Sequence, residues 1–332
     1  MSDSTVLVLL SAYNGARYIG EQLESIRAQT FRDWRLLIRD DGSSDQTPSI
    51  LESFAASDPR IEVLSDTYGN VGPFAGFGLL LSAAAQTNAR FVFLSDQDDV
   101  WIPTKMATQL ATLRSAEKKY GATHPILTHS DLEVVGEKLE PVHHSFREFQ
   151  GFSHDVDDPL QTLLIHSGMM GCTMAMNRAL LDVAVPLPAG SSHDWWVGLC
   201  AAATGTVLPS SERMVRYRQH GANTIGAHPK RAFFSRIVQH PFDSISEAFV
   251  AFDVGVMQSH ALKDRLEQIK FGDAATLRRV DRYTDVYSSR SFRSRIRSLR
   301  ESGAKPRRSL SRVFLLGIIA VFPRWKRKRQ RV

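Results

Sequence analysis

Apolar strands that alternate with amphipathic helices are the feature that most limits how this chain can fold. Four apolar runs, typical of strands buried on both faces of a sheet, occupy residues 6–10, 34–38, 61–64 and 91–94. After these runs apolar residues recur at helical spacing, for example at Ile19, Leu23 and Ile26. This rhythm predicts an α/β fold with a doubly wound, Rossmann-like, mostly parallel sheet flanked by helices.

The rest of the chain has a weaker pattern. We expect a long loop over 141–158, a strand over 168–176, a helix over 193–203, a short strand over 214–219 and helices over 230–285. With 332 residues and 43% hydrophobic content, the chain can bury a large α/β domain and still carry an extension. Both cysteines, Cys172 and Cys200, stand in apolar surroundings, which predicts buried thiols.

Polar clusters follow three of the predicted strands. They begin at Tyr13, Asp40 and Asp96, each directly after an apolar run. In open α/β sheets ligands bind beyond the carboxyl ends of the strands, near the point where the strand order reverses. The three clusters therefore predict a binding site at one rim of the sheet.

Two of these clusters are acidic. Three acids in four positions, Asp96, Asp98 and Asp99, repel one another, and their oxygen ligands suit Mn²⁺ or Mg²⁺ that also binds substrate phosphates. Asp41 can accept hydrogen bonds from a nucleobase or ribose, while Gly42 permits close approach of the backbone. The competing interpretation for both clusters is ordinary turn and helix-capping chemistry.

Two later segments also carry candidate groups. Asp194 opens a predicted helix and is either a helix cap or a general base for an acceptor hydroxyl. Trp195 and Trp196 beside it suit sugar stacking or core packing equally well. His220, which follows Arg218 before a glycine turn, suits a pyrophosphate or a metal, although a single loop histidine is usually structural.

Taken together and in this order, seven segments resemble the family-2 glycosyltransferases with the GT-A fold. The segments occupy residues 11–15, 29–31, 40–45, 70–72, 95–101, 193–196 and 218–221. The resemblance covers about residues 5 to 228, roughly two thirds of the chain. The sequence Ser-Asp-Gln-Asp-Asp-Val-Trp at 95–101 also resembles rhamnosyltransferases of bacterial surface polysaccharides.

The resemblance implies a role for each candidate residue. It places the donor nucleotide and sugar against Ala12, Tyr13, Asn14, Asp41, Asn70 and Asp96. It implies that Asp98 and His220 hold Mn²⁺ or Mg²⁺ and that Asp194 is the catalytic base of an inverting displacement. Trp195 and Trp196 are the candidates for stacking on the acceptor sugar. His193 departs from the family, because many relatives carry an acid immediately before the base.

Charge is distributed unevenly along the chain. The net charge is +6, but residues 290–332 hold 15 Lys and Arg and one acid, Glu301, so the remainder is acidic. An apolar block at 313–322 lies within this tail, which favours attachment to an anionic membrane surface over nucleic acid. We expect a catalytic domain over 1–228, a helical extension over 229–300 and a membrane-associating tail over 301–332. With no signal peptide or span recognised, a cytoplasmic location on the inner membrane face is predicted.

Several alternatives remain open from the sequence. The predicted donor is dTDP-L-rhamnose or a UDP-hexose, and the predicted acceptor is a glycan or a lipid-linked glycan. A nucleotidyltransferase or metal-dependent hydrolase on a similar sheet is a rival enzyme class. A binder of membranes or nucleic acid through the basic tail is the non-enzyme alternative. Dehydrogenases and P-loop ATPases are disfavoured, because the first strand lacks a Gly-x-Gly-x-x-Gly turn and Gly-x-x-x-x-Gly-Lys is absent.

Overall fold

The computed structural model describes residues 6–151, 157–221, 241–289 and 291–305. By their contacts the residues form two compact units. The first unit takes residues from 1–150 and 169–227, and the second takes residues from 151–168 and 228–332. Residues 151–168 therefore group with the second unit, although the chain on either side of them belongs elsewhere.

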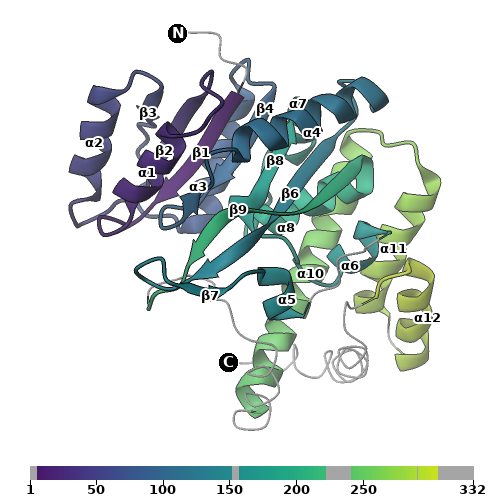
Figure 1. Ribbon diagram of the computed structural model, residues 1–332. Coiled ribbons are helices and arrows are strands. Elements are labelled where there is room, and N and C mark those ends of the chain that lie inside the picture. Colours follow the sequence, from purple (N-terminus) through teal and green to yellow (C-terminus); the bar gives the residue numbers. More distant parts are fainter. Residues whose placement is uncertain (1–5, 152–156, 222–240, 290, 306–332) are drawn as a thin grey trace. The chain divides into compact units, whose positions relative to one another are not determined.

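The first unit is built on one mixed sheet (Figure 1). Its strands are β1 (Val6–Ala12), β2 (Arg35–Asp40), β3 (Ile61–Val63), β4 (Phe91–Ser95), β5 (Val100–Trp101), β6 (Ile126–Val135), β7 (Pro141–His143), β8 (Met174–Asn177) and β9 (Thr206–Arg218). The order is β3-β2-β1-β4-β8-β6-β9-β5, with β7 paired to β6. Strands β3, β2, β1 and β4 are parallel, and so are β6 and β9, whereas β8 runs antiparallel between β4 and β6.

Helices cover both faces of this sheet. They are α1 (Ile19–Arg27), α2 (Thr47–Ser57), α3 (Pro73–Ala85), α4 (Lys105–Tyr120), α5 (Phe146–Gln150), α7 (Arg178–Ala184) and α8 (His193–Thr204). α3, α7 and α8 contact one another, and α1 contacts α2. The predicted fold class, a mostly parallel α/β sheet flanked by helices, is confirmed.

The strand order fixes where a ligand can bind. From β1 the chain steps outward to β2 and β3, and then returns to place β4 on the other side of β1. The order therefore reverses between β1 and β4, whose carboxyl ends are Ala12 and Ser95. Strand β1 is buried, with Val6, Val8 and Leu9 fully enclosed, so its end is rigidly held.

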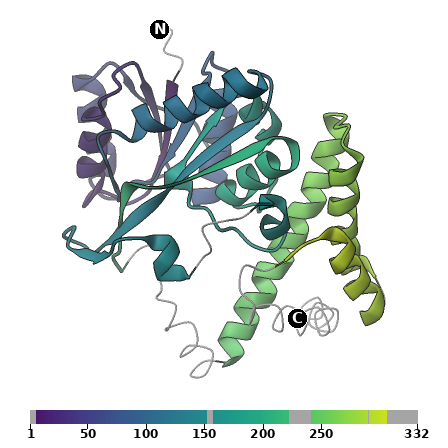
Figure 2. The ribbon, with the colours of Figure 1, turned by 45° about the vertical axis from the view of Figure 1, so that its right-hand side comes forward.

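Some predicted elements need correction. The sequence pattern missed β6, because its middle carries buried polar residues such as His129 and Asp131 instead of an apolar run. The expected loop over 141–158 contains β7 and α5. The strand expected from residue 168 begins only at Met174, because Gly171–Thr173 forms a 3-10 helix. Strand β9 is longer than predicted and pairs along β6 (Figure 2).

The second unit is helical in its described residues. It contains α6 (Pro159–Leu163), α10 (Pro241–Gln268), α11 (Ala274–Ser288) and α12 (Phe292–Ser302). α11 packs between α10 and α12 (Figure 2). Arg279 of α11 fastens the unit, since its guanidinium bonds Asp158 Oδ2 at 2.7 Å and the Ser302 carbonyl at 3.2 Å. The predicted C-terminal helical extension is thus present.

Membrane attachment was predicted for the chain's basic end. Among the residues that the structure describes, no helix combines the length and hydrophobicity needed to span a bilayer. Most of the tail predicted over 301–332 lies outside the described residues, which end at 305.

Candidate active site

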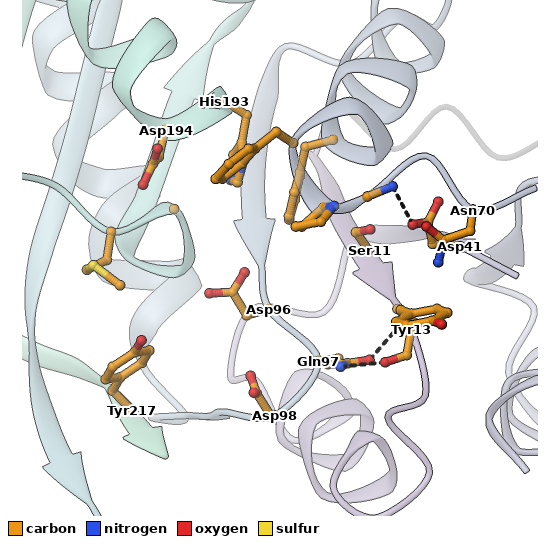
Figure 3. A pocket seen from close by; sticks show the side chains of 17 residues that line it. Ser11, Tyr13, Asp41, Asn70, Asp96, Gln97, Asp98, His193, Asp194 and Tyr217 are labelled. Atoms are coloured by element: carbon orange, nitrogen blue, oxygen red, sulfur yellow. Dashed lines mark hydrogen bonds between the residues drawn. The ribbon is translucent and has the colours of Figure 1, made fainter. Parts of the chain in front are cut away.

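A cavity of about 300 Å³ lies at the point where the strand order reverses (Figure 3). It is lined from the ends of β1 and β4, the loops after β2 and β3, and the N-termini of α3 and α8. Of the residues predicted from the sequence, the cavity brings together Ala12, Tyr13, Asp41, Asn70, Asp96, Asp98 and Asp194. Segments as far apart in the chain as Ala12 and Asp194 therefore supply one polar pocket.

Tyr13 presents an aromatic ring at this pocket. The ring is 48% exposed, but its backbone is fixed by Gln97, which accepts from the Tyr13 N–H at 2.9 Å and donates to its carbonyl at 3.0 Å. Gly15 makes this possible, because a Cβ there would lie 2.2 Å from Gln97 Oε1. A ring held in this way can stack on a flat ligand such as a nucleobase.

Asp41 lies on the same side of the pocket and is 2% exposed. Its carboxylate accepts the backbone N–H groups of Val71 at 2.9 Å and Gly72 at 2.8 Å, and it pairs with the buried guanidinium of Arg39. Asp41 thus holds the loop that carries Asn70 and leads into α3. Gly42, with a φ of +79°, lets the two loops approach closely.

Three carboxylates converge on the other side of the pocket. Figure 3 shows Asp96 between Asp98 and Asp194. Burial and the charges of Asp98 and Asp194 raise the pKa of Asp96 to about 7. The described residues that line the pocket include no Lys or Arg, so the site favours a bound cation or a proton.

Asp98 is paired with His220. His220 Nε2 lies 2.8 Å from Asp98 Oδ2, and the imidazole stacks on Tyr18 with ring centroids 4.6 Å apart. Arg218 supports the same loop, since its Nε donates to the Asp98 carbonyl at 2.8 Å. An oxygen and a nitrogen donor beside excess negative charge fit a divalent cation such as Mn²⁺ or Mg²⁺.

Asp194 lies in the first turn of α8 and is 7% exposed. One of its oxygens accepts from the Trp195 N–H at 2.6 Å and from the Ser192 hydroxyl. The helix N-terminus also favours a negative charge at this position. The side chain of Asp194 is therefore held in one orientation at the edge of the pocket, which suits proton abstraction as well as helix capping.

Four predicted residues do not line the pocket. Asn14 instead joins the loop after β1 to the loop after β2. Its N–H donates to Ser43 Oγ and its Oδ1 accepts from the Ser44 N–H, both at 2.8 Å. His220 does not line the cavity itself, but it is hydrogen-bonded to Asp98, which does. Trp196 is 0% exposed and donates its indole N–H to the Ala184 carbonyl at 2.7 Å, and Trp195 is 6% exposed. The prediction that Trp195 and Trp196 stack on a sugar needs correction, because both rings are buried in the fold.

The third acid of the cluster, Asp99, is also not among the residues that line the cavity. It is fully buried and accepts the Arg218 N–H at 3.2 Å. Burial raises its pKa well above the usual range, and the nearby Lys105, also buried, has its pKa lowered to about 7. These two groups form part of a buried polar layer beneath the site.

Sequence reasoning missed several residues that line the pocket. They include Gln97, Met170, Gly171, His193 and Tyr217. Burial and the nearby acids raise the pKa of Tyr217, so its hydroxyl stays protonated. Gln97 and His193 adjoin predicted site residues in sequence, which was the one available signal, while Met170 and Gly171 were hidden in a segment predicted as strand.

Comparison with known proteins adds an independent line of information. The family model described as "Glycosyl transferase family 2" matches residues 7–181, more than half of the chain. A glycosyltransferase of Nostoc sp. (strain PCC 7120) whose function is uncharacterised is 27% identical over 66% of this chain. The Escherichia coli UDP-Glc:alpha-D-GlcNAc-diphosphoundecaprenol beta-1,3-glucosyltransferase WfgD is 27% identical over 55% of this chain.

These matches are partial. The aligned regions cover 66% and 64% of the two relatives' own lengths, just under two thirds. Among solved structures, S. aureus TarS residues 1–349 in complex with UDP-GlcNAc superposes with a TM-score of 0.51. That match covers 90% of this chain and 89% of the other, at 18% identity, and it shows a shared fold.

Proposed function

Since the chain belongs to glycosyl transferase family 2 and is a glycosyltransferase, we propose that its pocket transfers a sugar from a nucleoside diphosphate to an acceptor hydroxyl. The observation that carries this proposal is the arrangement of two unlike sides in one cavity. Tyr13, Asp41 and Asn70 offer an aromatic and hydrogen-bonding side for the nucleotide. Asp96, Asp98 and Asp194 offer the carboxylates that the reaction needs.

The proposed reaction is a single inverting displacement. Asp194 takes the proton of the acceptor hydroxyl while its oxygen attacks the anomeric carbon of the donor sugar. The bond from that carbon to the diphosphate oxygen breaks, and the nucleoside diphosphate leaves with its electrons. Asp194 suits the base because its carboxylate is oriented by Ser192 and Trp195. Asp96, which lies between Asp98 and Asp194, is the residue that we propose for contact with the ribose or the donor sugar.

A divalent cation, Mn²⁺ or Mg²⁺, fits the acidic end of the pocket. Asp98 and His220 are the residues that would hold it, and it would supply positive charge to the departing diphosphate. Without a cation, the chain offers little compensation for that charge, because no Lys or Arg is among the described residues lining the cavity.

For the donor we propose a UDP-sugar. WfgD is named for UDP-Glc, and the superposed TarS structure contains UDP-GlcNAc. The other donor predicted from the sequence, dTDP-L-rhamnose, rests on the resemblance of residues 95–101 alone. Measuring the affinity of the protein for UDP and for dTDP distinguishes between these two donors.

For the acceptor we propose a lipid-linked glycan at the inner face of the cell membrane. WfgD is named for an acceptor carried on diphosphoundecaprenol. In this chain, α12 exposes Arg293, Arg297, Arg300 and the apolar Phe292, a combination that suits an anionic membrane surface. Family membership removes support from the rival enzyme classes and from a purely non-catalytic role for the basic tail.

The Asp194→Asn variant tests the proposed base. Transfer should fall by about 10²- to 10⁴-fold, because asparagine cannot accept the proton, while UDP affinity stays unchanged. The assay measures UDP release with UDP-glucose as donor and GlcNAc-diphosphoundecaprenol as acceptor. Asp182→Asn, an exposed acid on α7, is the matched control and should transfer at the wild-type rate. Wild-type turnover in Asp194→Asn would remove Asp194 from the mechanism.

A further inference from the structure

His193 is a buried polar residue of the pocket that the proposed mechanism leaves without a role. It is the first residue of α8, directly before Asp194, and it is 6% exposed. Its ring stacks on Phe77 of α3, with centroids 3.9 Å apart and planes inclined by 19°. Figure 3 shows the ring between Asp194 and the end of the pocket that holds Asp41.

Neither ring nitrogen of His193 has a hydrogen-bond partner within the described part of the chain. A neutral imidazole carries one donor and one acceptor, and buried groups of this kind are normally satisfied. Burial lowers the pKa of His193, which favours that neutral form. An unsatisfied donor and acceptor beside a cavity indicate that the partner is a ligand.

The surroundings hold the ring and bury both of its nitrogens without offering them a protein partner among the described residues. Phe77 supports one face of the ring. Opposite Nε2 stands Gly171, where an added Cβ would lie only 2.7 Å from that nitrogen. Any other residue at 171 would therefore collide with the imidazole, so the glycine is what allows His193 and residue 171 to line the cavity side by side.

We propose that His193 binds a hydroxyl group of the donor sugar and so helps to select it. This inference rests on the proposed function. The donor sugar has to lie between the nucleotide, next to Asp41, and the base Asp194, and His193 occupies that part of the wall. A hydroxyl both donates and accepts, which matches a neutral imidazole. Unlike an acid at this position, the imidazole adds no negative charge to a pocket that already holds three carboxylates.

Two variants separate this role from a structural one. His193→Leu keeps a similar volume and removes both nitrogens, whereas His193→Gln restores a donor and an acceptor. Calorimetry measures the affinity of each protein for UDP, UDP-glucose, UDP-N-acetylglucosamine and dTDP-rhamnose. The decisive comparison uses two ligands. One is the nucleotide sugar that the wild type binds most tightly, and the other is the same nucleoside diphosphate without its sugar.

We expect His193→Leu to bind that nucleotide sugar about 10- to 100-fold more weakly, since the sugar loses its hydrogen bond. The affinity for the nucleoside diphosphate alone should not change, and His193→Gln should recover most of the loss. The melting temperature of His193→Leu should equal or exceed that of the wild type, because no hydrogen bond to the protein is lost, a buried unsatisfied polar group is removed, and leucine still packs against Phe77. A structural role predicts a lower melting temperature and equal losses for both ligands.

Two results would overturn the assignment. One is a His193→Leu protein with wild-type affinity for the nucleotide sugar. The other is unchanged donor affinity with a raised KM for GlcNAc-diphosphoundecaprenol, which would move the contact to the acceptor. If the wild type binds none of the four ligands, the proposed function itself fails, and the role of His193 falls with it.

Discussion

At the scale of single residues, the pocket contains groups that are fixed by the fold and groups that are left for ligands. Asp41 is fixed by the N–H groups of Val71 and Gly72 and by Arg39, although a carboxylate with three partners can still accept one more hydrogen bond. His193 has both ring nitrogens unfilled among the described residues. A residue of the first kind contributes to stability as well as to binding, so its loss should be visible in unfolding measurements.

The Asp41→Asn variant tests this dual role. Arg39 is fully buried, and losing one of its two carboxylate partners while Asp66 remains should lower the unfolding free energy by about 2–3 kcal/mol. Urea unfolding monitored by circular dichroism measures the change. The exposed Asp182→Asn should cost about 0.5 kcal/mol or less. Lost UDP binding with unaltered stability would show that Asp41 acts on the nucleotide alone.

The sequence predicts the position of some site residues better than their orientation. Asp41, Asp96 and Asp98 were located because a polar group directly after a buried strand lies at the rim of the sheet. Trp196 was misplaced, because no sequence pattern tells which side of α8 faces the core when nearly every residue of the helix is buried. The role of His193 depends on Phe77 and Gly171, which are distant in sequence.

At the scale of elements, the regular half of the fold follows from apolar periodicity and the irregular half does not. β1, β2 and β4 were predicted because strands buried on both faces are continuously apolar. β6 was missed because it buries polar side chains, of which Asp131 is held by a tertiary partner, the Ser145 hydroxyl that donates to it at 2.5 Å. The periodicity of neighbouring residues does not reveal a hydrogen-bond partner that lies in another element of the chain.

Asn177 shows how one side chain joins several elements. It is fully buried at the end of β8, where its Oδ1 accepts from the N–H groups of Ile126 at 2.9 Å and Leu180 at 3.2 Å. Its Nδ2 donates to the His124 carbonyl at 2.9 Å and to Glu117 Oε1 at 3.2 Å. These bonds tie β8 to β6, α7 and α4.

We expect Asn177→Ala to lower the unfolding free energy by about 3 kcal/mol, because four hydrogen bonds are lost, one of which caps α7. Thermal and urea unfolding measure the loss. Asn88→Ala, at an exposed position, is the control and should leave stability within about 0.5 kcal/mol of the wild type. A result for Asn177→Ala as small as for the control would mean that the elements are joined by apolar packing alone.

At the scale of the whole molecule, charge separates the two ends of the chain. Residues 290–332 hold 15 of the 41 Lys and Arg residues and one acid, and the rest of the chain has a net negative charge. The clustered carboxylates of the pocket suit a reaction in which a cation assists the departing diphosphate. The basic end of the chain suits an acceptor that is presented by an anionic membrane. The domain limits of 1–228, 229–300 and 301–332 stay a prediction, and functional dissection at these limits can test them.

Removing residues 310–332 tests the membrane proposal. Binding to vesicles that contain anionic lipid should fall strongly, because the variant lacks the apolar block and the final basic run. Vesicle flotation measures the bound fraction, and added salt should weaken what remains. Transfer to a water-soluble acceptor analogue serves as the control for folding and should persist. An unchanged bound fraction would exclude the tail as an anchor.

The central claim is that this pocket binds a nucleoside diphosphate together with a divalent cation. Isothermal titration with UDP, dTDP and GDP, with and without Mn²⁺, tests it most directly, with Asp98→Ala measured beside the wild type. We predict that UDP binds, that Mn²⁺ tightens its binding, and that Asp98→Ala abolishes the effect of Mn²⁺. If the folded wild-type protein binds none of the three nucleotides in the presence of Mn²⁺, the account of this pocket is contradicted.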